Sequence, residues 1–510
     1  MSRSIYTCRP LMAILLLAGL GLAGTAPAAA DASTSPAPAV ATRPADPQWA
    51  ISPGRGPSAG GTTVTLTQPE AGRFTQVSAK SSHSSAITSD GNLYTWGKNN
   101  RGQLGRDTGG SDRDENPAIV AKPAGVDTWT QTGAGAEHSI AIGSDGNLYT
   151  WGDNNHSQLG RDTGSATKDA NPGMVAKPAG VDTWTQAITG NRHSMAIGSD
   201  GNLYTWGDNY YGQLGRGTDW EDENPGMVAK PAGVDTWTQI GIGSYHSMAI
   251  GSDGNLYTWG DNYYRQLGRG TTISTDRPGK VNKPAGVDTW TQAGTGNYHS
   301  LAIGSDGNLY TWGDNSQDQL GRDTNGNWRD ANPGVVAKPA GVDAWTKAIT
   351  GGYYHSLAIG SDGNLYTWGD NSQDQLGRDT GGDSHDPTPG MVAKPSSVDT
   401  WTPVIAGGNY HSLAIGSDGN LYTWGDNEYG QLGRNTDMND RDGNPVSVAL
   451  PYLVVLTGVE FDGQAATGLT ANADGSWTAA TPAHAAGQAD VTISWTLNGT
   501  PQPDQHLTYT

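Results

Sequence analysis

Short apolar runs alternate with turn-rich polar stretches along most of the chain, and one such pattern returns many times. In one copy it predicts four short strands, Thr238–Ile242, His246–Gly251, Leu256–Gly260 and Gly279–Lys283, the last ended by Pro284. Asp253-Gly254 between the second and third strands predicts a tight hairpin, because Asp-Gly supplies the positive φ that such a turn requires. The apolar spacing has no helical period, so we expect antiparallel β-structure.

The repeat is defined by three aligned series of residues. The string DGNLYTWG occurs seven times at intervals of 53 to 56 residues, and a histidine stands thirteen residues before each of its tryptophans. The tryptophans are Trp96, Trp151, Trp206, Trp259, Trp312, Trp368 and Trp424. The histidines are His83, His138, His193, His246, His299, His355 and His411. A further aromatic precedes each histidine, at Phe74, Trp129, Trp184, Trp237, Trp290, Trp345 and Trp401.

Four antiparallel strands per copy predict one propeller blade, and seven copies predict an all-β, seven-bladed propeller. Neighbouring blades cover both faces of a blade. Tyr257 and Trp259 share one face of the third strand, while Ser247 and Ala249 keep one face of the second strand small. We therefore expect large aromatics of one blade to lie against small residues of the next.

The repeated segment, H-S-x-A-I-G-S-D-G-N-L-Y-T-W-G-D-N-x-x-x-Q-L-G-R, resembles the regulator of chromosome condensation repeat. The resemblance extends from Phe74 to about Leu450. It implies the seven-bladed propeller of that family, whose members include a secreted β-lactamase inhibitory propeller and others that act through protein contacts. The inhibitor's target cannot be carried over, because the loops differ.

The two flanks of the repeats carry a second pattern. Residues 49–68 resemble the opening of an IPT/TIG immunoglobulin-like domain, and residues 452–510 resemble the remainder in that family's order. The resemblance implies one small β-sandwich with the propeller, 69–451, inserted after its first strand. Two unrelated edge segments are the alternative.

Residues 1–30 have the features of a secretory signal peptide. Arg3 and Arg9 precede a short apolar run, and Ala28-Ala29-Ala30 supplies a cleavage site. Cys8 is the sole cysteine and would leave with the signal, so the mature chain is expected to have no disulfide. Residues 31–48, rich in Ala, Pro and Ser, predict a linker. We expect a secreted protein, free or associated with a cell surface, without a transmembrane segment.

Composition and charge narrow the function classes. Gly 74 and Pro 28 together make a fifth of the 510 residues, which disfavours a helical or α/β enzyme. The net charge of −20 opposes binding to a phosphate backbone, so we expect no nucleic-acid partner.

No residue of the repeats is singled out as catalytic, because most polar motif positions recur in every copy. The histidines are interpreted as architectural, each hydrogen-bonding a backbone group, since a ring of them would be too wide for one ion. We expect no catalytic residue, no metal and no cofactor.

The copies differ mainly in the loops between strands one and two and between strands three and four, which share one end of each blade. Tyrosines gather there, and tyrosine suits recognition surfaces. The predicted partner-binding residues are Tyr210, Tyr211, Tyr245, Tyr263, Tyr264, Tyr298, Tyr354, Tyr410, Tyr429 and Trp220.

We therefore expect a monomeric binding or adhesion protein, not an enzyme, whose partner is a protein or, as a second option, a glycan. One alternative is guanine-nucleotide exchange, implied by the family's name but at odds with an export signal. A glycoside-active enzyme that uses Asp219 and Glu221 is another.

Overall fold

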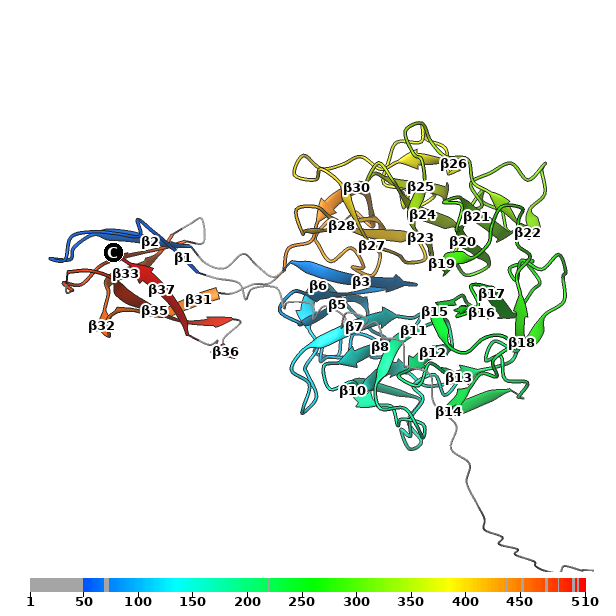
Figure 1. Ribbon diagram of the computed structural model, residues 1–510, viewed down its shortest axis with the longest axis horizontal. Coiled ribbons are helices and arrows are strands. Elements are labelled where there is room, and N and C mark those ends of the chain that lie inside the picture. Colours follow the sequence, from blue (N-terminus) through cyan, green and yellow to red (C-terminus); the bar gives the residue numbers. More distant parts are fainter. Residues whose placement is uncertain are drawn as a thin grey trace, which may run out of the picture. The chain divides into compact units, whose positions relative to one another are not determined.

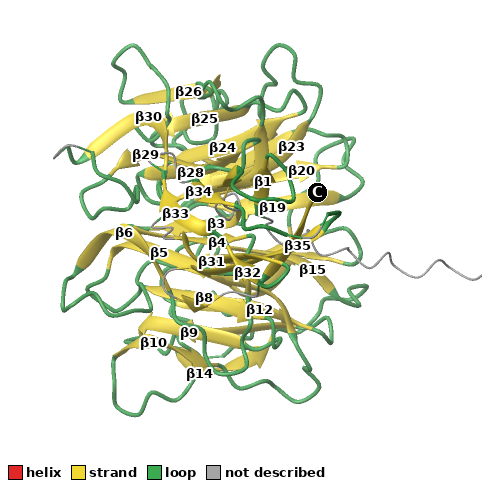
Figure 2. Ribbon diagram, turned by 90° about the vertical axis from the view of Figure 1, so that its left-hand side faces the viewer, coloured by secondary structure: helices red, strands yellow, loops and turns green. Residues whose placement is uncertain are grey.

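The computed structural model describes residues 49–67, 73–218, 220–436, 439–450, 454–472, 476–484, 486–497, 500–501 and 504–510. Strands and connecting loops make up this part of the chain, and no helix occurs in it (Figure 2). The predicted signal peptide, 1–30, and linker, 31–48, lie outside the described residues.

Between Phe74 and Ser447, the described residues form seven four-stranded antiparallel sheets, each of four consecutive strands, which we number blades 1 to 7. The first strands are β3 (Phe74–Lys80), β7 (Trp129–Ala134), β11 (Trp184–Thr189), β15 (Trp237–Ile242), β19 (Trp290–Thr295), β23 (Trp345–Gly351) and β27 (Trp401–Gly407). The second strands are β4 (His83–Thr88), β8 (His138–Gly143), β12 (His193–Gly198), β16 (His246–Gly251), β20 (His299–Gly304), β24 (His355–Gly360) and β28 (His411–Gly416).

The third and fourth strands complete each blade. The third strands are β5 (Leu93–Lys98), β9 (Leu148–Asp153), β13 (Leu203–Asp208), β17 (Leu256–Gly260), β21 (Leu309–Asp314), β25 (Leu365–Asp370) and β29 (Leu421–Asp426). The fourth strands are β6 (Arg113–Ile119), β10 (Lys168–Met174), β14 (Glu221–Met227), β18 (Thr275–Lys280), β22 (Arg329–Val335), β26 (His385–Met391) and β30 (Arg441–Ser447). Figure 1 shows the first strands gathered at the centre of the blades and the fourth strands at their outer edge.

The fourth strand is where the strand prediction is wrong. Blade 4 ends with Thr275–Lys280, whereas the apolar pattern placed this strand at Gly279–Lys283. The observed strand is polar, has no buried residue, and contains Pro278. A proline fits there because the fourth strand is an edge strand whose outer side needs no ladder hydrogen bond.

The turn between the second and third strands is as predicted. Gly254 has a φ of +70°, and the Asp253 carboxylate accepts hydrogen bonds from the backbone N–H of Asn255 and the hydroxyl of Tyr257, at 3.1 and 2.7 Å. The aspartate therefore holds the hairpin to the third strand.

Apolar side chains fill the space between neighbouring blades. Tyr257 and Trp259 of blade 4 are buried in one cluster with Met195 and Ile197 of blade 3. Ser247 and Ala249 are instead the cross-strand partners of Trp259 and Tyr257 in the same sheet. Trp259 does lie against a small residue of the neighbouring blade, as expected, but that residue is Gly215, where a Cβ would be 2.5 Å from Trp259 Nε1. The small residues of the second strand instead leave room beside the aromatics within one blade.

Blade 7 packs against blade 1 in the same way. Phe74 and Trp96 of blade 1 share a buried cluster with Leu413 and Ile415 of blade 7. The first and last repeats, far apart in sequence, thus make the contact that other repeats make with their sequence neighbours.

The flanks of the repeats form a separate two-sheet unit. One sheet is ordered β1 (Ala50–Ser52), β2 (Thr63–Thr67), β34 (Trp477–Ala480), β33 (Thr467–Ala471). The other contains β32 (Gln464–Ala465), β31 (Val454–Phe461), β35 (Ala489–Leu497) and β36 (Thr500–Pro501), with β37 (Gln505–Tyr509) also paired to β35.

The two flanks share one core, because β2 pairs with β34 in the register Thr63↔Ala480 to Leu66↔Trp477. Val64 and Leu66 are buried with Phe461, Ile493 and other residues of the C-terminal flank. The segment before the repeats contributes two strands, β1 and β2, to this unit.

Candidate functional site

The seven repeat histidines link each blade to the next through a serine hydroxyl. The Nε2···Oγ distances are 2.9 to 3.0 Å, and every histidine is fully buried. The pairs are His83–Ser139, His138–Ser194, His193–Ser247, His246–Ser300, His299–Ser356, His355–Ser412 and His411–Ser84. The histidines are structural, but their expected backbone partner is wrong, because the bond crosses to a side chain of the following blade.

The proton on each imidazole can be assigned from the serine. Ser247 donates its hydroxyl proton to the backbone carbonyl of Gln213 at 2.8 Å, so its oxygen accepts the N–H of His193 Nε2. Burial lowers the pKa of six of these histidines to about 3 and that of His193 well below its ordinary value. The histidines are therefore neutral at physiological pH and unsuited to act as acids.

The repeat tryptophans bind the same glutamine carbonyls. Trp259 Nε1 donates to the Gln213 oxygen at 2.9 Å, beside the Ser247 hydroxyl. Blade 1 is joined to blade 7 identically, because Trp96 and Ser84 both donate to Gln431. The remaining pairs are Trp151–Gln103, Trp206–Gln158, Trp312–Gln266, Trp368–Gln319 and Trp424–Gln375.

Lys80, the last residue of the first strand of blade 1, departs from the repeated sequence. Blades 2 to 7 have a glycine at this position, and the Lys80 amine reaches across to the carbonyl of Ile242 in blade 4 at 2.9 Å. Burial lowers the pKa of Lys80 to about 7. This lysine ties together two blades that are not neighbours.

The variable loops bring the predicted tyrosines together in two runs of touching rings. The first run is Trp220–Tyr210–Tyr211–Tyr245, with ring centroids 5.9, 4.8 and 5.0 Å apart. Its contact between Tyr211 and Tyr245 joins a three–four loop to a one–two loop, which confirms that these loops share one end of the blades.

The second run spans blades 4 to 7. Tyr263 contacts Tyr264 at 5.0 Å, and Tyr264 contacts Tyr298 at 4.5 Å. The ring centroid of Tyr353 lies 6.1 Å from that of Tyr298, and 5.5 and 5.8 Å from those of Tyr354 and Tyr410. We call the two runs together the tyrosine surface.

Sequence reasoning missed Tyr353, which joins three of the predicted tyrosines. The doubled Tyr353-Tyr354 before His355 was its signal, since no other copy has more than one tyrosine in the two positions before the histidine. Tyr429 lies apart from both runs in the described residues, with the Lys98 amine 5.4 Å from its ring centre.

A hollow of about 490 Å³ lies where the two runs meet. Its walls are Tyr211, Tyr245, Tyr263, Tyr264, Tyr298, Asp261, Thr272 and Ser274. Tyr210 and Tyr263 are each 63% exposed and Trp220 is 71% exposed, so these rings present aromatic area to solvent. We call this cavity the tyrosine hollow.

Carboxylates lie beneath the tyrosine surface. An aspartate follows or ends the third strand in blades 2 to 7, at Asp153, Asp208, Asp261, Asp314, Asp370 and Asp426. Burial raises the pKa of Asp314 and of Asp426. Burial, and after it the charge of a nearby aspartate, raises the pKa of Tyr211 and that of Tyr354, the latter to about 12. The surface therefore has a negative field behind its aromatic rings.

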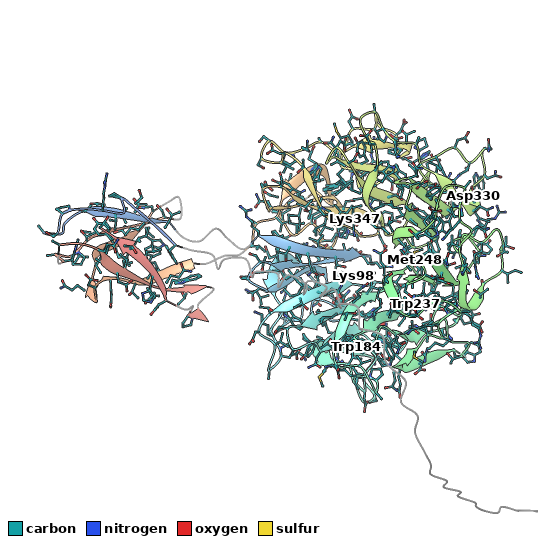
Figure 3. All side chains as sticks on the ribbon, viewed as in Figure 1. Lys98, Trp184, Trp237, Met248, Asp330 and Lys347 are labelled. Atoms are coloured by element: carbon teal, nitrogen blue, oxygen red, sulfur yellow. The ribbon has the colours of Figure 1, made fainter. Side chains whose placement is uncertain are left out.

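A second hollow, of about 940 Å³, lies at the outer rim between blades 5 and 6. Trp328 lines it and is 76% exposed, and His385 pairs with Asp318 at 2.7 Å. Asp330 of the same rim forms an ion pair with Arg322 at 2.8 Å (Figure 3).

The residues of the glycoside alternative are not brought together by any described contact. Asp219 lies outside the described residues, and the Glu221 carboxylate is 4.0 Å from His156 Nδ1. Among the described residues, no group of three His, Cys, Asp or Glu side chains is arranged to hold a metal ion. Nor does that part of the chain contain a helix with the length and apolar character to cross a membrane.

Comparison with family models matches residues 52–338 to the RCC1-like domain. Residues 347–375, 405–431 and 362–415 match the regulator of chromosome condensation (RCC1) repeat. Protein pim1 of Schizosaccharomyces pombe is 30% identical over 400 residues, covering 71% of this chain and 70% of its own. The ultraviolet-B receptor UVR8 of Arabidopsis thaliana is 29% identical over 360 residues, covering 70% and 78%.

Solved structures agree on the fold. Human WBSCR16 has a TM-score of 0.63 at 22% identity, covering 72% of this chain and 96% of its own. Yeast RCC1 (Prp20), solved bound to Kap60, has a TM-score of 0.62 at 20% identity, covering 81% and 89%. A second structure of Prp20p, described with its binding to Gsp1p and histones, has a TM-score of 0.60 at 20% identity, covering 80% and 93%.

Proposed function

Since the chain belongs to the family of RCC1-like domains, we propose that it is a binding protein whose tyrosine surface engages a protein partner. The observation that supports this proposal most directly is the difference in sequence between the two ends of the blades. At one end the Asp-Gly turns repeat almost unchanged, while at the other the loops differ and their tyrosines join in two continuous runs. The relative Prp20 has been solved bound to a protein, which supports the same class of role.

A binding role accounts for the repeat residues better than catalysis does. The histidines are neutral, buried and hydrogen-bonded between blades, and the aspartates of the hairpins accept hydrogen bonds that stabilise the turns. Seven equivalent positions supply no singular acid, base or nucleophile. We therefore propose a binding protein and not an enzyme, with a glycan as a less favoured ligand.

The domain plan that we propose is a seven-bladed propeller inserted into an IPT/TIG-like sandwich. The pairing of β2 with β34 and the shared core of the two flanks support it. A sandwich made from both flanks holds the two chain ends of the propeller. Together with the predicted signal peptide, this plan favours a secreted, monomeric protein at or near a cell surface.

An affinity capture tests the proposed function. Residues 31–510 would be incubated with envelope and host-surface extracts, beside a variant in which Tyr245, Tyr264, Tyr298 and Tyr354 are all alanine. We expect a protein that the first bait captures and the second loses, with both baits folded by circular dichroism.

The matched control is Trp328→Ala, which removes an exposed aromatic ring from the rim hollow. This variant should capture the partner as well as the unchanged protein does. Equal capture by all baits, or loss with Trp328→Ala alone, would move the function away from the tyrosine surface.

A further inference from the structure

The tyrosine hollow has two aromatic walls, one from blades 3 and 4 and the other from blades 4 and 5. Tyr211 and Tyr245 form one wall, with ring centroids 5.0 Å apart, and Tyr264 and Tyr298 form the other, 4.5 Å apart. The faces of such rings carry negative charge density and attract cations. The walls therefore favour a cationic group that can lie flat between them.

The charged group in the lining of this hollow is a carboxylate. Asp261 is 7% exposed and accepts hydrogen bonds from Gln266 Nε2 at 2.9 Å, from the backbone N–H of Tyr263 at 3.1 Å and from the Ser274 hydroxyl at 3.4 Å. All three donors are neutral, and no ion pair among the described residues includes Asp261. Its negative charge thus adds to that of the rings, and the acidic chain attracts cations at longer range.

The protein itself shows that these rings accept a guanidinium. The Arg329 guanidinium carbon lies 4.4 Å from the centre of the Tyr263 ring and 4.7 Å from that of Tyr264. Its Nη1 donates to the Tyr263 carbonyl at 3.1 Å, which holds it at the edge of the hollow. Within the described residues, no cation lies over the rings of Tyr211, Tyr245 or Tyr298.

We propose that the tyrosine hollow receives an arginine side chain of the protein partner, an inference that rests on the proposed function. A planar guanidinium can stack on tyrosine faces and still direct N–H donors at a carboxylate. Lysine has a compact, strongly hydrated charge and fits such a slot less well. The hydroxyl of Thr272 in the lining offers a further acceptor.

A peptide titration tests this inference without the natural partner. The probe is a fluorescein-labelled heptapeptide, Gly-Ser-Arg-Gly-Arg-Ser-Gly, measured by anisotropy against the same peptide with citrulline or lysine in place of arginine. We expect the arginine peptide to bind at least tenfold more tightly than the citrulline peptide, with lysine between. Equal binding of arginine and citrulline peptides would overturn the inference.

Variants locate the binding. Tyr245→Leu with Tyr298→Leu should weaken arginine-peptide binding about tenfold, as loss of two cation–π contacts implies. Arg329→Ala should tighten it a few-fold, because an internal competitor leaves the rings. Arg441→Ala is the matched control: it removes the same charge from the same strand position, but its contact is Asp374 at 3.0 Å.

The outcomes separate this inference from the proposed function. If Arg329→Ala and Arg441→Ala change the affinity equally, the hollow is not the site, whether or not the tyrosine double variant folds. If the captured partner depends on the tyrosines but is not displaced by excess arginine peptide, the inference fails and the proposed function stands. If no partner depends on the tyrosines, the proposed function fails.

Discussion

Individual residues of the repeat are constrained by close contacts between blades. Gly215 of blade 3 has a φ of +71°, and a Cβ there would lie 2.5 Å from Nε1 of Trp259 in blade 4. Gly233 also has a positive φ, +89°, but a Cβ at that position would meet no atom within 4 Å. Substituting each glycine by alanine therefore distinguishes the loss of stability caused by backbone strain from the loss caused by a steric clash.

We predict that Gly215→Ala lowers the free energy of unfolding by about 3 kcal/mol or more, since strain and overpacking add. Gly233→Ala should lower it by about 1 kcal/mol, the cost of the positive φ alone. Urea denaturation followed by tryptophan fluorescence measures both. Equal losses of unfolding free energy would show that the close packing of Gly215 against Trp259 does not contribute to stability.

Lys80 should make stability depend on pH in the alkaline range. Burial lowers its pKa to about 7 from 10.5, so between these values the unfolded chain binds a proton that the native chain does not. Stability should therefore rise from pH 7 to pH 10.5, by up to about 1.4 kcal/mol per pH unit. We predict that Lys80→Met removes this rise and stabilises the protein at pH 7 by about 2 to 4 kcal/mol.

Denaturation midpoints at pH 7 and pH 9.5 measure this effect. Lys168→Met, which changes an exposed lysine, should follow the unchanged protein at both pH values. A Lys80→Met variant with the same pH dependence as the unchanged protein would contradict the assignment of a buried neutral amine.

The first strands of the blades are joined by a glutamine belt that is interrupted in blades 6 and 7. Gln186 Nε2 donates to the carbonyl of Thr238 in the next blade at 2.8 Å, and Gln239 Oε1 accepts the N–H of Ala293 at 2.8 Å. Blade 6 has Lys347 at this position, near the centre of the blades in Figure 3, and blade 7 has Pro403. Burial lowers the pKa of Lys347.

Lys347→Gln should extend this belt into blade 7. Its amide can reach the Thr402 carbonyl, as Gln292 reaches that of Thr346, and we predict a gain of about 1 kcal/mol in the free energy of unfolding. Chemical denaturation beside Lys168→Gln, a surface control, measures it. No gain over the control would mean that blade 7 cannot take up the bond.

Elements that are repeated in every copy could be predicted from the sequence, whereas contacts between one blade and the next could not. The second and third strands have apolar patterns that repeat in register, so their bounds in blade 4 were predicted correctly. The fourth strand is a polar edge strand and has no such pattern. The serine partner of each histidine depends on how one blade lies on the next, which the spacing within a repeat does not contain.

The candidate site could likewise be predicted only in part. The tyrosines and their common end of the blades could be predicted, because loop differences between copies are visible in the sequence. The hollow, the contact of Arg329 with two rings and the joining role of Tyr353 arise from three-dimensional proximity of different blades. A pattern within one repeat does not encode such contacts.

The whole molecule should be acid-labile because its blades are joined by neutral histidines. The native pKa values of six of them are lowered to about 3 and that of His193 is lowered well below its ordinary value, whereas an unfolded histidine titrates near 6.5. Between these values the unfolded chain binds more protons, so stability falls as the pH falls. Seven such residues give a slope of up to about 10 kcal/mol per pH unit.

We predict cooperative unfolding within about one to two pH units below 6.5, because a typical domain is stable by only about 5 to 15 kcal/mol. Circular dichroism during acid titration, with potentiometric proton uptake, measures it. His506→Gln, which changes an exposed histidine, should leave the midpoint unchanged. A native spectrum at pH 4 would contradict the buried neutral histidines.

At the scale of the whole molecule, we propose that the varied end of the blades binds a protein and the copied end does not. Site-specific photo-crosslinking tests this directly, with benzoylphenylalanine at Tyr263 on the tyrosine surface or at Ala232 in a copied, exposed loop. We expect the captured partner to crosslink through position 263 and not through position 232. Crosslinking through position 232 alone would contradict it.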